Sequence, residues 1–226
     1  MDETKRLAID VVSDVVCPWC FIGKRKLEAA LAGLATSEPS LATTVRWHPF
    51  ELNPDLPSSG IARSEYLERK WGSVARANES YVRVRSVGEA VGIPFRFDLI
   101  ERQPNTFDAH RLVAWAQQQG DANELVERLF AAYFVEARFV GDRAELARIA
   151  GETGLSEHDA RAMLESDAAR DQVESEAREA LDVGVRGVPF YIFNGRIAVS
   201  GAQDPKALLE AIAAARRAEE SNSGMP

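Results

Sequence analysis

The chain has 226 residues, 46% of them hydrophobic, which is enough to bury the core of one elaborated domain or of one domain inserted into another. Asp and Glu outnumber Lys and Arg by 35 to 27, so the formal net charge is −8. This balance argues against nucleic acid or an anionic membrane as the main partner, because both attract positive charge.

The first sixty residues predict a strand, a helix and a second strand. Residues 7–12 alternate and are rich in β-branched side chains, which is typical of a strand. Residues 18–35 carry leucines at helical spacing, with a proline in the first turn. Residues 43–52 predict the second strand, and the turn-rich segment 53–60 ends this β-α-β unit.

From about residue 61 the periodicity becomes helical. Apolar residues recur three, four or seven positions apart, as at Val74, Ala77, Tyr81, Val84 and Val91. Capping patterns begin two of the later segments, Asp142 with Glu145 and Ser156 with Asp159. Besides the short helix that begins at Ser156, the sequence predicts helices over 107–120, 122–137, 142–154 and 171–185.

Strand character returns near the C-terminus. Residues 188–201 predict a hairpin around Asn194-Gly195, and residues 204–220 predict a terminal helix. If the helical segment in the middle of the chain is left out, the remaining predicted elements form one compact βαβββ-type unit. The expected organisation is therefore an N-terminal half (1–60), an inserted helical domain (61–183), a C-terminal half (184–218) and a frayed tail (219–226).

The only two cysteines, Cys17 and Cys20, lie where the first strand passes into the first helix. At a helix N-terminus, unpaired N–H groups and the helix dipole favour a thiolate. The spacing then allows Cys17 to attack a disulfide and Cys20 to resolve the mixed disulfide. Pro18 and Trp19, between the cysteines, set the geometry and polarity of this loop.

Two other interpretations of the cysteine pair remain open. A C-x-x-C motif is also half of a zinc site, but only His48, His110 and His158 remain as further ligands besides carboxylates, and no H-x3–5-H spacing occurs. The pair could also be two ordinary buried cysteines. We expect no metal.

A second signal is the stretch "RGVPFYIFNG" (186–195). A proline at this position is compatible with a plain edge-strand start, or with a cis Val188–Pro189 bond in a tight turn. Beside a dithiol, the second arrangement would expose the backbone of Val188 for pairing with an extended substrate.

The segments "SDVVCPWCFIG", "WHPFELNP", "NTFDAHRL" and "GVPFYIFN…SGAQ" together resemble the FrnE-like branch of the DsbA-type thioredoxin superfamily. The resemblance extends to about residue 215. It implies an α/β thioredoxin fold with an inserted all-helical domain, and thiol–disulfide oxidoreductase activity. Val188 and Pro189 match the cis-proline dipeptide of that family, which contacts substrate.

The sequence departs from the family pattern in two ways. Relatives often carry a buried acid six residues before the nucleophile, where this chain has Val11, and some carry a second cysteine pair. Asp10 and Asp14 are the nearest carboxylates, and Asp14 is the candidate for tuning the thiolate. His110 is a second candidate, either facing the dithiol or lying as a surface or core histidine.

The leading function is a disulfide oxidoreductase acting on a disulfide- or thiol-containing protein or small molecule. One alternative is a glutathione-dependent isomerase or transferase, similar to 2-hydroxychromene-2-carboxylate isomerases and kappa-class glutathione transferases, which typically have serine at the Cys17 position. Another is a redox-inactive binding module. We expect no cofactor besides the dithiol, with glutathione as a candidate co-substrate, and a homodimer is compatible with the sequence.

The sequence predicts a cytoplasmic protein. The N-terminal segment begins with Met1 and charged residues and lacks the apolar stretch of a signal peptide, and no long apolar run suggests a membrane-spanning helix. In a reducing compartment a catalytic dithiol is favoured over a structural disulfide.

Overall fold

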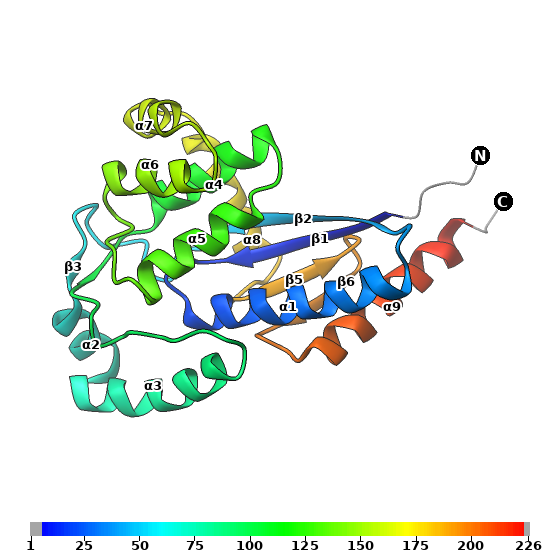
Figure 1. Ribbon diagram of the computed structural model, residues 1–226, viewed down its shortest axis with the longest axis horizontal. Helices are drawn as coiled ribbons and strands as arrows, with labels where there is room; N and C mark the ends of the chain where they lie inside the picture. The colour runs from blue at the N-terminus through cyan, green and yellow to red at the C-terminus, as the bar shows by residue number, and fades with distance from the viewer. Residues whose placement is uncertain (1–5, 224–226) are drawn as a thin grey trace.

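The computed structural model describes residues 6–223, with side chains up to Glu219. Its centre is a four-stranded sheet of order β2-β1-β5-β6 (Figure 1). β2 runs parallel to β1, whereas β5 pairs antiparallel with β1 and β6 antiparallel with β5. The strands are β1 (Arg6–Ser13), β2 (Ala42–Pro49), β5 (Phe190–Phe193) and β6 (Ile197–Ser200).

Helices cover both faces of the sheet (Figure 1). α1 (Pro18–Ser37) and α9 (Pro205–Ser223) lie side by side on one face, where they cover the buried odd-numbered residues of β1. α8 (Arg170–Asp182) covers the other face, where Val12 of β1 packs with Ala180 and Val185. Alternate residues of β1 therefore pack against the helical layers on opposite faces of the sheet.

The segment between β2 and α8 forms two helical arms on either side of the N-terminus of α1 (Figure 1). One arm holds α2 and α3, and the other holds α4 to α7. Their bounds are α2 (Arg63–Trp71), α3 (Val74–Glu89), α4 (Phe107–Gln119), α5 (Asn123–Phe134), α6 (Arg143–Glu152) and α7 (Glu157–Glu165).

The inserted segment is helical except for one small sheet. β3 (Ile61–Ala62) pairs antiparallel with β4 (Arg102–Gln103) at the base of α2. Strands of two residues have no periodicity to detect, which is why the sequence predicted an all-helical insertion. α8, expected as the last helix of the insertion, packs on the central sheet and so contributes a layer to the thioredoxin unit.

Aromatic packing fixes α1 relative to the insertion. Phe21 stacks on Phe130 of α5 with 5.1 Å between ring centroids, and meets Phe95 edge-on at 6.1 Å. Phe95 in turn meets Phe134 edge-on at 5.3 Å. Because Phe21 directly follows Cys20, these contacts position the start of the helix that carries the cysteines.

Several element ends differ from the sequence prediction by a few residues, and hydrogen bonds explain two of these differences. β2 ends at Pro49 rather than residue 52, because the amide of Leu52 turns to donate to the Asp14 carboxylate. α9 continues to Ser223, through part of the predicted frayed tail 219–226. Asn194 of the β5–β6 hairpin donates to the Glu219 carboxylate at 2.7 Å and holds this end of the helix. Residues 224–226 of the predicted tail lie outside the described residues.

Candidate active site

The cysteines lie at the junction between the central strand and α1, at the end of the sheet that both helical arms flank (Figure 1). Cys17 is the N-cap residue of α1, with extended backbone, and its amide donates to the Asp14 carbonyl at 2.9 Å. The amide of Cys20 closes the first turn on the Cys17 carbonyl at 3.0 Å. Both are free thiols, one helical turn apart at the positive end of the helix dipole.

The two thiols differ in exposure in the expected order. Cys17 is 5% exposed and Cys20 is 1% exposed. Attack on an incoming disulfide requires access to Cys17, but this residue is nearly covered in the structure. Trp19, two positions after Cys17, is half-buried. The Arg83 guanidinium of α3 lies over its indole, with 6.0 Å between Cζ and the ring centroid. The α3 arm therefore reaches the dithiol loop.

Val188 and Pro189 lie directly beside the first cysteine. The Val188–Pro189 peptide bond is cis, one of the two forms that the sequence left open. The Cys17 thiol points at the Val188 carbonyl oxygen, with 3.6 Å between Sγ and O. A segment 171 residues away in the chain thus contributes a backbone acceptor to the sulfur.

The environment of Cys20 opposes its ionisation. Desolvation by burial raises the pKa of the Cys20 thiol well above its ordinary value, and the neighbouring Cys17 raises it further. The Ser13 hydroxyl and the backbone N–H of Asp14 act in the opposite direction. A thiol that resolves a mixed disulfide must lose its proton first, so Cys20 would need a route for its proton to take that role.

Asp14 and His110 form a buried polar pair behind the dithiol. The Asp14 carboxylate is fully buried and accepts from the amides of Leu52 at 2.7 Å and Val16 at 3.3 Å. Nε2 of His110 lies 3.2 Å from the Phe50 carbonyl oxygen and 3.6 Å from Asp14 Oδ1. Of the positions that the sequence left open for His110, the structure shows the buried one, and the ring faces Asp14.

Sequence reasoning missed a close contact beneath the active-site helix. A Cβ on Gly23 would lie 2.9 Å from Pro189 Cγ, and closer still to the hydroxyl of Tyr191. Both partners belong to the C-terminal half of the chain, so this glycine lets α1 rest on the Val188–Pro189 loop. The only signal in the sequence is a glycine three residues after Cys20, on the face that must be buried.

A buried cationic cluster in the insertion was also missed. Arg63 donates to Tyr81 Oη at 2.6 Å and to the side chain of Gln103, and its guanidinium lies 5.1 Å from the Tyr66 ring centroid. Burial raises the pKa of Tyr81 to about 12, although Arg63 opposes the shift. A negative charge on Cys17 would add to this rise, which places the cluster within electrostatic reach of the dithiol.

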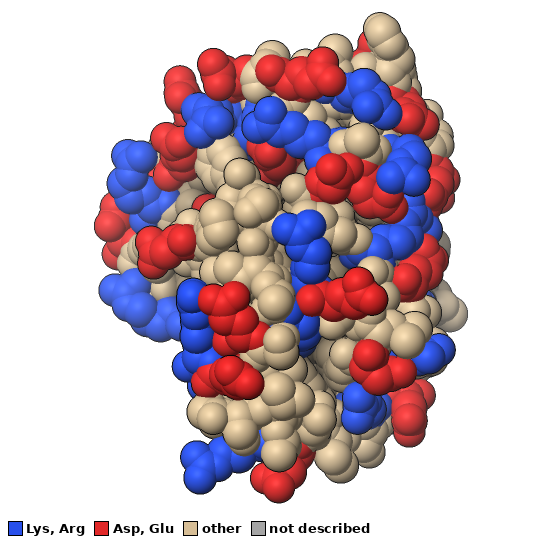
Figure 2. All heavy atoms as spheres, turned by 90° about the vertical axis from the view of Figure 1, so that its left-hand side faces the viewer, with Lys and Arg blue, Asp and Glu red and all other residues tan. Residues whose placement is uncertain are grey.

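The surface around this end of the molecule is electrically mixed. Figure 2 shows the side toward which the N-terminus of α1 points: acidic and basic side chains surround a central band of uncharged ones. A site for a polyanion would concentrate Lys and Arg here instead.

The family model for the DSBA-like thioredoxin domain matches residues 8–213, which includes both halves of the central sheet, the insertion and the dithiol. The chain belongs to the DSBA-like thioredoxin domain family. Its fold class, a thioredoxin fold with a helical insertion, is confirmed.

Three relatives of this DSBA-like domain extend the comparison. A probable DsbA oxidoreductase from Streptomyces coelicolor is 30% identical, with a TM-score of 0.82, and the match covers 92% of this chain and 89% of that one. The uncharacterized protein YwbO of Bacillus subtilis (strain 168) is 27% identical, covering 84% of this chain and 88% of YwbO. A 2-hydroxychromene-2-carboxylate isomerase shares the fold, with a TM-score of 0.65, 17% identity and coverage of 96% and 98%.

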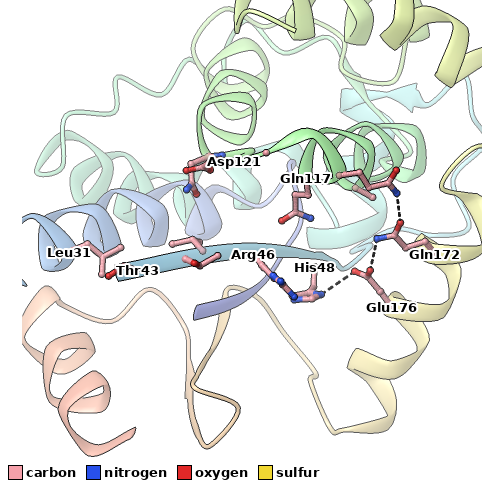
Figure 3. A pocket seen from close by; sticks show the side chains of 14 residues that line it. Leu31, Thr43, Arg46, His48, Gln117, Asp121, Gln172 and Glu176 are labelled. Atoms are coloured by element: carbon pink, nitrogen blue, oxygen red, sulfur yellow. Dashed lines mark hydrogen bonds and ion pairs between the residues drawn. The ribbon is translucent and has the colours of Figure 1, made fainter. Parts of the chain in front are cut away.

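A second polar network of this DSBA-like domain lies along the outer edge of β2. Part of it lines a cleft of about 630 Å³, where Figure 3 shows His48, Glu176 and Gln172. His48 Nε2 lies 2.9 Å from Asp10 Oδ1, and His48 Nδ1 lies 3.1 Å from Glu176 Oε2. The Gln172 side chain extends this hydrogen-bond network from Glu176 to Gln118. These bonds join β1, β2, α8 and α4.

Because of this network, the free energy of unfolding should depend on pH. Desolvation by burial lowers the pKa of His48, but the hydrogen bonds and charges of Asp10 and Glu176 outweigh it and raise the pKa from 6.5 to about 9. Protonated His48 therefore stabilises the fold fully below about pH 6.5, and this contribution is lost as the pH rises through about 9. His48→Gln should lower the free energy of unfolding by roughly 2 kcal/mol near pH 6 and much less near pH 10.

Urea denaturation at the two pH values measures this difference. His158→Gln, on the exposed surface of α7, is the control and should change stability by less than about 0.5 kcal/mol. An equal loss for His48→Gln at both pH values would show that its protonation contributes nothing to the fold.

Among residues 6–223, no helix has the length and apolar character needed to cross a membrane. Within the same residues, no group of three or more His, Cys, Asp or Glu side chains is placed to hold a metal ion.

Proposed function

We propose that this DSBA-like domain is a thiol–disulfide oxidoreductase that works through Cys17 and Cys20. The observation that carries the proposal is the pairing of a helix N-terminal dithiol with the Val188 carbonyl, 3.6 Å from Cys17 Sγ. A substrate strand that pairs with the backbone at Val188 would bring its disulfide against Cys17.

In the reducing direction, the Cys17 thiolate attacks one sulfur of the substrate disulfide. A Cys17–substrate disulfide forms, and the other substrate sulfur leaves as a thiolate that takes up a proton. Deprotonated Cys20 then attacks Cys17 Sγ, which forms the Cys17–Cys20 disulfide and releases the second substrate thiol. The substrate gains two electrons and the dithiol loses two, and oxidation of a substrate dithiol is the reverse sequence.

The substrates that fit are disulfide- or thiol-containing proteins or small molecules, with glutathione as a candidate co-substrate. Because both cysteines belong to the dithiol, the chain has no cysteine left for a structural disulfide, which suits the reducing cytoplasm. We include a cytoplasmic location in the proposal. The negative net charge supports neither nucleic acid nor an anionic membrane as a partner.

The expected result is that the protein accelerates the reduction of insulin by dithiothreitol, followed as turbidity, and that Cys17→Ser with Cys20→Ser removes the acceleration. The control is Thr36→Ala, which removes an exposed hydroxyl in the last turn of α1, at the opposite end of that helix from the dithiol. Acceleration that persists in the double variant would overturn the proposal.

A glutathione-dependent isomerase is the second candidate, supported by the shared fold of the 2-hydroxychromene-2-carboxylate isomerase. Such an enzyme activates one thiol and has no step for a resolving cysteine. Calorimetric titration with glutathione, combined with turnover by Cys20→Ser, separates the two candidates, because only the isomerase should keep its full rate without Cys20.

A further inference from the structure

The proposed mechanism leaves the proton of Cys20 without an acceptor. Val11, at the position where relatives carry a buried acid, is 1% exposed and packs in the apolar core. Asp10 is bonded to His48 instead. Because burial raises the pKa of Cys20, its deprotonation at neutral pH requires a path out of the core.

A small cavity lies beside the end of β1, next to Ser13. Its volume is about 20 Å³, and its wall includes Ser13, His48, His110 and Val113. This exceeds the roughly 10–15 Å³ that one water molecule needs. The cavity therefore has room for a single water between the end of β1 and α4.

Ser13 connects this cavity to the resolving cysteine. Its residue is 6% exposed, and its hydroxyl has no hydrogen-bond partner among residues 6–223. The hydroxyl is nevertheless close enough to Cys20 to oppose the rise of the Cys20 pKa. A buried hydroxyl without a protein partner is costly unless a water satisfies it.

Only one of the two histidines in the cavity wall can accept a proton. Both ring nitrogens of His48 are bonded to carboxylates, which holds that ring protonated. In His110, Nε2 lies 3.2 Å from the Phe50 carbonyl, a contact that requires a proton on Nε2. The neutral ring then carries its free lone pair on Nδ1.

Charged side chains lie close to His110 on several sides. Asp14 Oδ1 lies 3.6 Å from Nε2, as a buried counterion. Glu51 is near enough for His110 to affect its pKa, which desolvation raises. Glu51 is half-buried, and protonated His48 lies on the same cavity wall as His110.

We propose that the cavity binds one water molecule, and that Ser13 and this water pass the proton of Cys20 to Nδ1 of His110. The inference rests on the proposed oxidoreductase function. The Cys20 S–H bond breaks, the resulting thiolate attacks Cys17 Sγ, and the Cys17–substrate bond breaks. The leaving substrate thiolate recovers a proton from solvent, so one proton is given up and one taken up.

The test follows resolution of a mixed disulfide between Cys17 and glutathione. Each reduced variant is mixed with oxidised glutathione, quenched with acid at successive times and analysed by mass spectrometry, from about pH 6 to about pH 9. Ser13→Ala should slow the conversion of adduct to intramolecular disulfide about tenfold or more at low pH, with the difference shrinking as the pH rises.

Val113→Ile tests the water, because the added methyl group fills the cavity without removing a polar atom. It should slow resolution about as much as Ser13→Ala does. Wild-type rates and pH profiles in Ser13→Ala would overturn the relay, and wild-type behaviour in Val113→Ile would overturn the part given to water. Absence of any Cys17 adduct in the wild-type protein would instead refute the proposed function, and the relay with it.

Discussion

Cys20→Ser should accumulate mixed disulfides on Cys17, whereas Cys17→Ser should accumulate almost none. The serine at position 20 removes the resolving thiol but leaves Cys17 at the N-terminus of α1, beside the Val188 carbonyl. Its adduct can then leave only by attack from a second molecule. Cys20, 1% exposed and with its pKa raised by burial, cannot replace Cys17 as nucleophile.

Both variants are expressed, quenched with acid, alkylated and separated on non-reducing gels, with the double serine variant as the blank. The adducts of Cys20→Ser should exceed those of Cys17→Ser by about tenfold or more. Equal trapping by the two single variants would contradict the division of roles. Full turnover by Cys20→Ser would favour the isomerase.

Gly23→Ala should destabilise the protein by about 2–3 kcal/mol, because the new methyl group would overlap Tyr191 and the Pro189 ring. Neither neighbour can move easily. Tyr191 is fully buried in β5, and proline has a rigid ring. The strain would fall on the contact between α1 and the Val188–Pro189 loop, so disulfide exchange should slow as well.

Gly33→Ala is the matched control in the same helix, since its Cβ would meet no atom within 4 Å. It should stabilise the protein by about 0.5–1 kcal/mol through helix propensity. Urea denaturation of both variants measures the contrast. A Gly23→Ala variant as stable as Gly33→Ala would mean that α1 does not rest on this loop as closely as the structure shows.

Local patterns were sufficient to predict most elements. The alternation in β1 and the leucines of α1 each follow from one buried face. Asp142 and Ser156 cap α6 and α7 through the amides three residues later, as predicted. Asn194-Gly195 forms the β5–β6 turn, with positive φ at both residues, which is the conformation that makes this dipeptide a hairpin signal.

The sequence could not reveal features that depend on distant contacts. Gly23 and Tyr191 pack closely although they lie 168 positions apart in the sequence. No local periodicity of the sequence can indicate such a contact. Likewise, Ser13 reads as the polar end of a strand until the cavity behind it is known. His48 of β2 bonds to Glu176 of α8, a contact that the pattern of its own strand does not predict. Such pairings follow from how the insertion folds back on the sheet.

Equilibration with glutathione redox buffers tests the central claim most directly. The protein is incubated over a series of ratios of reduced to oxidised glutathione, quenched with acid and weighed intact by mass spectrometry. The account predicts a reversible two-electron transition between the dithiol and a Cys17–Cys20 disulfide, two hydrogens lighter, that is absent from either single serine variant. A chain that forms no intramolecular disulfide at any ratio would contradict it.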